Sequence, residues 1–113
     1  MGTWKYFDKI MDAHSLTKLI KQHQLSISPN SVFNLLTAAG VIEIKEYPST
    51  TGSGVMKNYK SITDGFLDYG KNVWTQHEFK TEPRFYADSF AALMMIVFEQ
   101  LGKEISTELA GDD

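Results

Sequence analysis

The spacing of apolar residues divides the chain into a helical part, a β-rich part and a final helical part. Apolar side chains recur every three or four positions in residues 4–12 and again from Leu16 to Ile20, which predicts two short helices. Ser15 stands directly before the second helix, where its hydroxyl can satisfy a free backbone N–H. We expect that helix to end near His23 or Gln24.

A third helix is predicted from Ser28 to Gly40. Ser28 followed by Pro29 is a typical helix start, because the hydroxyl caps the helix and proline at the first helical position loses no hydrogen bond. Gly40 stands where a left-handed residue would end the helix. The apolar face would consist of Val32, Leu35, Leu36 and Ala39.

The next segments predict a β-hairpin. Residues 41–47 are rich in β-branched side chains and partly alternating, and residues 55–62 form a second such run. Residues 48–54 between them contain one proline and two glycines, which favour a turn. Thr63 would then cap a short helix that ends at Gly70.

The remaining residues predict an ordered loop followed by one long helix. Residues 71–83 show little periodicity and would wrap back over the domain, anchored by Val73, Trp74 and Phe79. Pro83 would open a helix from Arg84 to about Leu109, in which Gly102 is a candidate interruption.

This order of elements is typical of a winged helix-turn-helix. We therefore expect an α+β fold with a β-hairpin wing and a long C-terminal helix, in which two short helices hold a third at a fixed angle for entry into a DNA groove. A chain of 113 residues suits one domain, with helices and wing in 1–81 and the long helix in 82–110.

Polar residues on these elements are candidate contacts to double-stranded DNA. Asparagine can pair with adenine, serine and threonine can bond phosphates or bases, and lysine can neutralise phosphates. The third helix would present Asn30, Ser31, Asn34 and Thr37, the second helix Lys18 and Lys21, and the hairpin Lys45, Lys57, Asn58 and Lys60. Residues 28–40 contain no Lys or Arg, which favours the alternative of a protein-binding module, since cations dominate affinity for DNA.

Two stretches resemble phage antirepressor C-terminal domains of the KilA-C type. Residues 16–42 are similar to the opening of such domains, in which a helix and a turn precede a Ser-started helix with a Leu-Leu pair and a glycine. Residues 60–70, Lys-Ser-Ile-Thr-Asp-Gly-Phe-Leu-Asp-Tyr-Gly, are similar to the segment that follows their wing. The body of the wing departs from the family pattern, and we expect the chain to lack the N-terminal partner domain that is usual in the family. The resemblance implies a phage or prophage origin and a regulatory role associated with DNA.

Charge is unevenly distributed along the chain. The net charge is −3, but residues 1–81 hold nine Lys against seven acidic residues, whereas residues 82–113 hold two basic against seven acidic residues. A basic body with an acidic tail is compatible with a nucleic-acid partner for the body alone. An excess of two charges over 81 residues is also what an ordinary surface can carry.

Catalytic, metal and cofactor sites are not predicted. The chain has no cysteine, and the spacing of His14, His23 and His77 matches no metal motif. Gly52-Ser53-Gly54 lacks the Lys and helix that follow a phosphate-binding loop. Because no catalytic residues stand out, we expect a protein that is not an enzyme. The start of the chain does not resemble a signal peptide, and no apolar run reaches the length of a membrane span, so we expect a cytoplasmic protein.

The last helix is apolar on most sides, which predicts a second subunit. A domain of this size can cover one side of a terminal helix, and the other would pack against a second copy in a homodimer. The predicted interface residues are Phe90, Leu93, Met94, Val97, Phe98 and Leu101. The alternative is that residues 1–14 and 71–82 cover this helix. The functional hypothesis is a dimeric, phage-type regulatory DNA-binding module, with a module that binds a host or phage regulator as the alternative.

Overall fold

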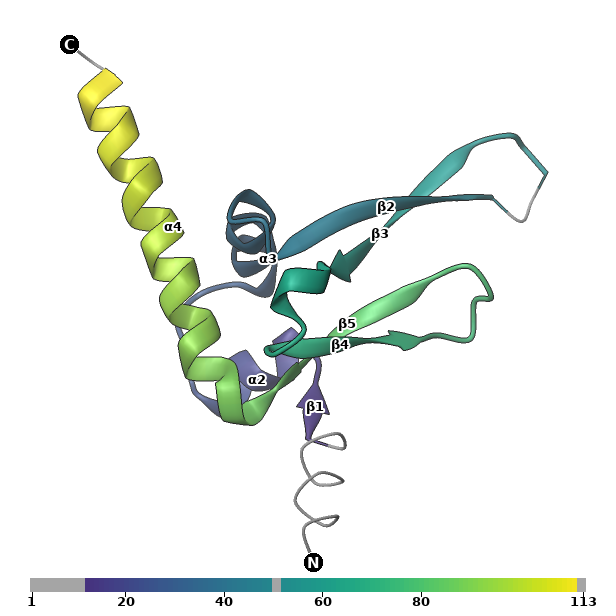
Figure 1. The fold of residues 1–113 in the computed structure, drawn as a ribbon, viewed down its shortest axis with the longest axis horizontal. Coiled ribbons are helices and arrows are strands. Elements are labelled where there is room, and N and C mark those ends of the chain that lie inside the picture. The colour runs from purple at the N-terminus through teal and green to yellow at the C-terminus, as the bar shows by residue number, and fades with distance from the viewer. Residues whose placement is uncertain (1–11, 50–51, 112–113) are drawn as a thin grey trace, which may run out of the picture.

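The computed structural model describes residues 12–49 and 52–111, which form a mixed α+β fold of helices and two antiparallel sheets (Figure 1). The helix predicted within residues 4–12 falls almost wholly outside these ranges. The elements in chain order are β1 (Ala13–His14), α2 (Leu16–Gln22), α3 (Pro29–Ala38), β2 (Ile42–Pro48), β3 (Met56–Ile62), η1 (Asp64–Phe66), β4 (Gly70–Trp74), β5 (Thr81–Tyr86), η2 (Ala87–Ser89) and α4 (Phe90–Gly111).

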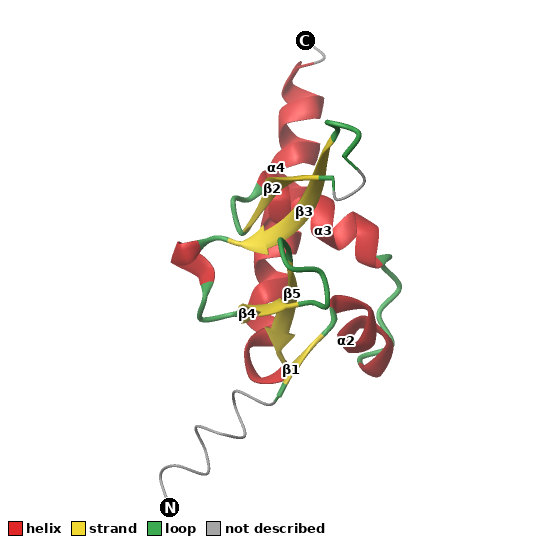
Figure 2. Cartoon of the chain, turned by 90° about the vertical axis from the view of Figure 1, so that its right-hand side faces the viewer, coloured by secondary structure: helices red, strands yellow, loops and turns green. Residues whose placement is uncertain are grey.

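Helices α2 and α3 confirm the predicted caps. The Ser15 hydroxyl accepts a hydrogen bond from the Lys18 backbone N–H at 3.2 Å, and the Ser28 hydroxyl accepts one from Ser31 at 3.1 Å. Pro29 occupies the first turn of α3, and Gly40 has a φ of +83°, the left-handed conformation expected after a helix. Both helices lie on one side of the strands (Figure 2).

Strands β2 and β3 form the predicted hairpin, in register from Ile42 opposite Ile62 to Pro48 opposite Met56. Its base is buried and most of its length is exposed. Thr63 does not cap η1 with its side chain, which instead donates a hydrogen bond to the Gly40 carbonyl at 2.9 Å. This contact ties the end of the hairpin to the end of α3.

The loop predicted for residues 71–83 is wrong, because these residues belong mainly to a second hairpin. Strands β4 and β5 pair from Gly70 opposite Phe85 to Trp74 opposite Thr81, and β1 adds to the other edge of β5. Gly70 therefore starts a strand and does not end a helix. A side chain on Gly70 would collide with the backbone carbonyl of Arg84, so this strand pair requires glycine there.

Pro83 lies within β5 and does not open the last helix, which begins at Phe90. The Tyr86 backbone N–H donates to the Tyr69 carbonyl, and the Thr75 N–H donates to the Lys80 carbonyl. Hydrogen-bonded and non-hydrogen-bonded pairs alternate along an antiparallel ladder, so Lys71 and Val73 of β4 stand in hydrogen-bonded pairs. Pro83 stands opposite Asn72, between two such pairs, and β1 pairs only with Phe85 and Tyr86. The missing N–H of proline is therefore not needed by either neighbouring strand.

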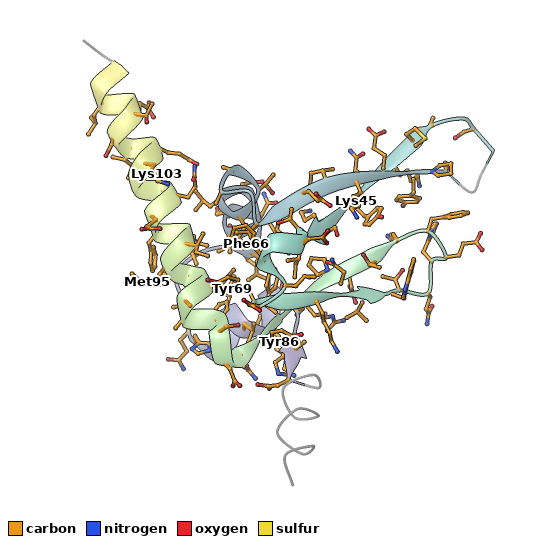
Figure 3. All side chains as sticks on the ribbon, viewed as in Figure 1. Lys45, Phe66, Tyr69, Tyr86, Met95 and Lys103 are labelled. Atoms are coloured by element: carbon orange, nitrogen blue, oxygen red, sulfur yellow. The ribbon has the colours of Figure 1, made fainter. Side chains whose placement is uncertain are left out.

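The core lies where α2, α3 and the first half of α4 meet the bases of the two hairpins. Phe85, Phe90, Leu93 and Val97 are almost fully buried there with residues of α2 and α3. Phe66 and Tyr69, whose rings lie 6.2 Å apart, pack against this core between α4 and the strands (Figure 3). No helix in the described part of the chain is long and apolar enough to cross a membrane.

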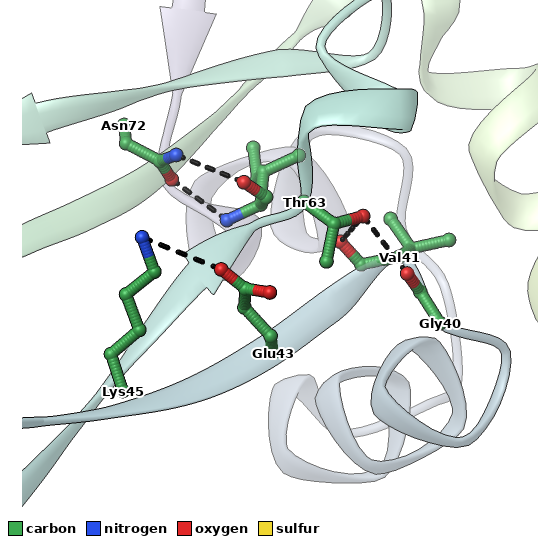
Figure 4. Close-up of polar contacts among 7 residues, drawn as sticks. Gly40, Val41, Glu43, Lys45, Thr63 and Asn72 are labelled. Atoms are coloured by element: carbon green, nitrogen blue, oxygen red, sulfur yellow. Dashed lines mark hydrogen bonds and ion pairs between the residues drawn. The ribbon is translucent and has the colours of Figure 1, made fainter.

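The two hairpins are joined by the side chain of Asn72. Its Oδ1 accepts a hydrogen bond from the Ile62 backbone N–H at 2.8 Å, and its Nδ2 donates to the Ile62 carbonyl at 3.0 Å (Figure 4). Farther out, the rings of Tyr47 and His77 lie 4.9 Å apart. Asn72 thus continues the hydrogen bonding of β3 across to the second sheet.

The burial of α4 corrects part of the predicted dimer interface. Phe90, Leu93, Met94 and Val97 are at most 5% exposed, because α3 and the strands cover them. Phe90, Leu93 and Val97 therefore cannot lie between two copies that keep this fold, whereas Met94 lines a shallow surface cavity. Phe98 and Leu101 are exposed, at 53% and 38%. Helix α4 runs through Gly102 without interruption.

Candidate nucleic-acid interface

The outer face of α3 is polar and uncharged. Asn30, Ser31, Asn34 and Thr37 are all exposed, as the helical spacing predicted. Two of their hydroxyls bond locally, since Ser31 accepts from the Ser28 hydroxyl at 2.8 Å and Thr37 donates to the Phe33 carbonyl at 2.7 Å. Among the described residues, the side chains of Asn30 and Asn34 have no hydrogen-bond partner. The two amides are therefore free to form hydrogen bonds with a ligand, and the Ser31 hydroxyl keeps its own proton to donate.

The two lysines of α2 are exposed and lie three positions apart, on the helix that precedes α3. Residues that far apart lie on the same side of a helix, so Lys18 and Lys21 extend in similar directions. Lys21 also stands in the last turn of α2, where a cation interacts favourably with the helix dipole.

The four hairpin residues do not share one face. Neighbouring side chains of a strand point to opposite sides, so Asn58 and Lys60 lie on one face of the hairpin and Lys57 on the other. Lys45 stands opposite Tyr59 and shares the face of Lys57. The pattern of a hairpin cannot by itself show which of its faces is open.

The two faces differ in what surrounds them. Lys45 forms an ion pair with Glu43 at 3.4 Å, so its charge is partly compensated. Lys60 is half-buried, with its Nζ 5.2 Å from the centre of the Phe33 ring on α3. This cation–π contact holds Lys60 beside the third helix.

A groove on the Lys60 side brings together several elements. Its volume is about 340 Å³, and its walls include Phe33 of α3, Asn58 and Lys60 of β3, and Ser15 and Thr17 at the start of α2. The far wall comes from the second hairpin, with Lys80 and Thr81. Of these groove residues, only Asn58 and Lys60 were predicted as site residues. Lys80 and Thr81 were missed because the segment that holds them was not predicted to form strands.

The described structure also shows where the positive charge lies. From α2 through β3, residues 16–62 carry five Lys against two Glu. Residues 63–111 carry four basic against eight acidic residues. Helices α2 and α3 with the first hairpin thus form the basic part of the molecule, and residues 63–111, which include the second hairpin and α4, form the acidic part.

The described residues hold no group of three or more His, Asp or Glu side chains that could bind a metal ion. His14 lies 3.0 Å from the Asp12 carboxylate, and the His23 ring packs on Phe90 at 5.1 Å. The three histidines therefore lie in different surroundings. Comparison of the chain with family models, curated proteins and solved structures finds no match to any of them.

Proposed function

We propose that residues 13–62 act as a winged helix-turn-helix that binds double-stranded DNA, with α3 as the recognition helix and the β2–β3 hairpin as the wing. The observation that carries this proposal is the coincidence of element order and charge. The order β1, α2, α3, β2, β3 is that of a winged helix, and it falls on the part of the chain with five Lys against two Glu. The second hairpin is an addition, and it pairs with β1 in place of the wing.

In this proposal α3 contacts the bases, and the neighbouring elements α2 and β3 contact the phosphates. Asn30 and Asn34 lie on an exposed helix face without cations, where their amides can pair with adenine. Lys18, Lys21 and Lys60 lie on the elements on either side of α3, as phosphate contacts do when a recognition helix enters the major groove. A regulatory role agrees with the resemblance to KilA-C type domains.

The proposal predicts that lysines of the basic part govern affinity. In fluorescence anisotropy with a labelled random-sequence duplex at low salt, Lys18→Ala with Lys21→Ala should weaken binding roughly tenfold or more, because two phosphate contacts are lost. Lys103→Ala removes the same kind of exposed charge from the acidic part, on α4, and should leave binding unchanged. Equal losses in both variants would mean that the basic part is not the binding surface.

A protein-binding role is the second candidate, and the lack of any Lys or Arg on α3 favours it. In that case Asn30, Asn34 and Thr37 would contact a polar protein surface. The same titration separates the two candidates, because a protein-binding module has no measurable affinity for the duplex at low salt.

A further inference from the structure

The second half of α4 carries an apolar stripe that the rest of the chain does not cover. From Phe98 onward nearly every described residue of this helix is exposed, and α4 runs clear of the strands (Figure 1). Phe98 is 53% exposed, Ile105 52% and Leu109 68%, and Leu101 lies between them. At 100° per residue these four side chains fall on one side of the helix.

Gly102 lies in the same row of the helix. Phe98, Gly102, Ile105 and Leu109 follow one another at spacings of four, three and four residues. Glycine inside a helix costs about 1 kcal/mol relative to alanine. Nothing in the described structure requires it, since a side chain at this position would meet no atom within 4 Å and its φ is ordinary. Close approach of another helix would explain a glycine at this position.

A shallow apolar cavity continues the stripe onto the body of the protein. It has a volume of about 320 Å³ and is lined by Leu25, Ser26 and Ile27 from the α2–α3 connection and by Met94 and Phe98 of α4. The same surface thus holds a hollow at one end and projecting Ile105 and Leu109 side chains at the other. A surface of this kind is complementary to itself after a two-fold rotation.

We infer that two copies of this chain pair through α4 in antiparallel orientation, with the two-fold axis close to Leu101 and Gly102. Ile105 of one copy then lies beside Phe98 of the other, and Leu109 reaches the level of Met94 and the cavity. A parallel pair would leave the cavity of each copy unfilled, because Ile105 and Leu109 would face their own equivalents. Gly102 next to the axis lets the two helices approach closely.

The area of the stripe suits a dimer. A fully buried Phe removes about 150–250 Å² from water, so each half-exposed large side chain offers on the order of 100 Å². Leu25, Phe98, Leu101, Ile105 and Leu109 together offer roughly 500 Å² on each copy. In typical interfaces about 57% of the buried area is non-polar. At that ratio, roughly 500 Å² of apolar area corresponds to an interface of about 900 Å² per copy, close to the ~800 Å² of a standard interface.

The mass of the full chain in solution tests this pairing. Sedimentation equilibrium between 1 and 100 µM should give the mass of a dimer for the natural chain. Ile105→Gln with Leu109→Gln should raise the dimer dissociation constant at least tenfold, without unfolding, because both side chains are exposed in one copy. Thr107→Gln is the control, since Thr107 is exposed on the opposite side of α4, nine positions and about 180° around the helix from Phe98. A monomeric mass at 100 µM, or equal weakening by Thr107→Gln, would overturn the inference.

Two further variants test the orientation and the role of the glycine. The chain has no cysteine, so Leu101→Cys introduces a single thiol near the proposed axis and should form an intermolecular disulfide on mild oxidation. Ile105→Cys should not, because in an antiparallel pair its equivalent lies about 10 Å away along the helix. Cross-linking of both would show a parallel pair. Gly102→Ala should weaken the dimer, and a dimer of unchanged or greater strength would contradict close packing at this residue.

Discussion

At the scale of single residues, several positions act through their backbone geometry. Ser15 and Ser28 cap α2 and α3, and Gly40 ends α3 with a positive φ. These roles could be predicted from the sequence, because capping and turn formation depend on neighbours within four residues. The role of Gly70 could not, because the Arg84 carbonyl that excludes a side chain there comes from a strand fourteen residues later.

Gly70→Ala should therefore destabilise the protein markedly. The added methyl group would meet the Arg84 carbonyl, and the strand pair would have to separate, which costs about 1–3 kcal/mol or more. Urea denaturation followed by circular dichroism measures the free energy of unfolding. Gly65→Ala is a matched control, because a side chain there meets nothing within 4 Å and should change stability by less than about 0.5 kcal/mol.

At the scale of elements, α2, α3 and the first hairpin were predictable from the sequence, whereas β1 and the structure between residues 71 and 89 were not. The first hairpin has a long β-branched run and a Gly-containing turn, which are local signals. The second hairpin has short strands, and the position of Pro83 in the sequence is typical of a helix start. Only the pairing of β5 with β4 and β1 shows that the proline N is not needed there. The groove residues Lys80 and Thr81 could not be predicted for the same reason, since they belong to this second hairpin.

Asn72→Leu should loosen the contact between the two hairpins. The change removes both hydrogen bonds to the Ile62 backbone and leaves a buried N–H and carbonyl without these partners, at a cost of about 1–3 kcal/mol. Amide hydrogen exchange at Ile62 should accelerate more than that of Leu36 in α3. Equal acceleration at both amides would indicate global destabilisation and no specific role for Asn72.

At the scale of the whole molecule, the described structure separates a basic part from an acidic part. A division of the sequence at residue 81 gives net charges of +2 and −5, and a division at the end of β3 gives +3 and −6. The boundary at the end of β3 gives seven Lys against four acidic residues in 1–62 and four basic against ten acidic residues in 63–113. Like charges of DNA and of the acidic part should repel each other and orient the protein with α3 toward the duplex.

The salt dependence of DNA binding tests the proposed function most directly. With Lys18, Lys21, Lys57 and Lys60 as the available cations, a plot of log Kobs against log[NaCl] for a random-sequence duplex should have a slope of about −2 to −4. Lys18→Ala should make that slope shallower by about one. An absence of binding at 50 mM NaCl, or a slope near zero, would contradict the account and favour a protein partner.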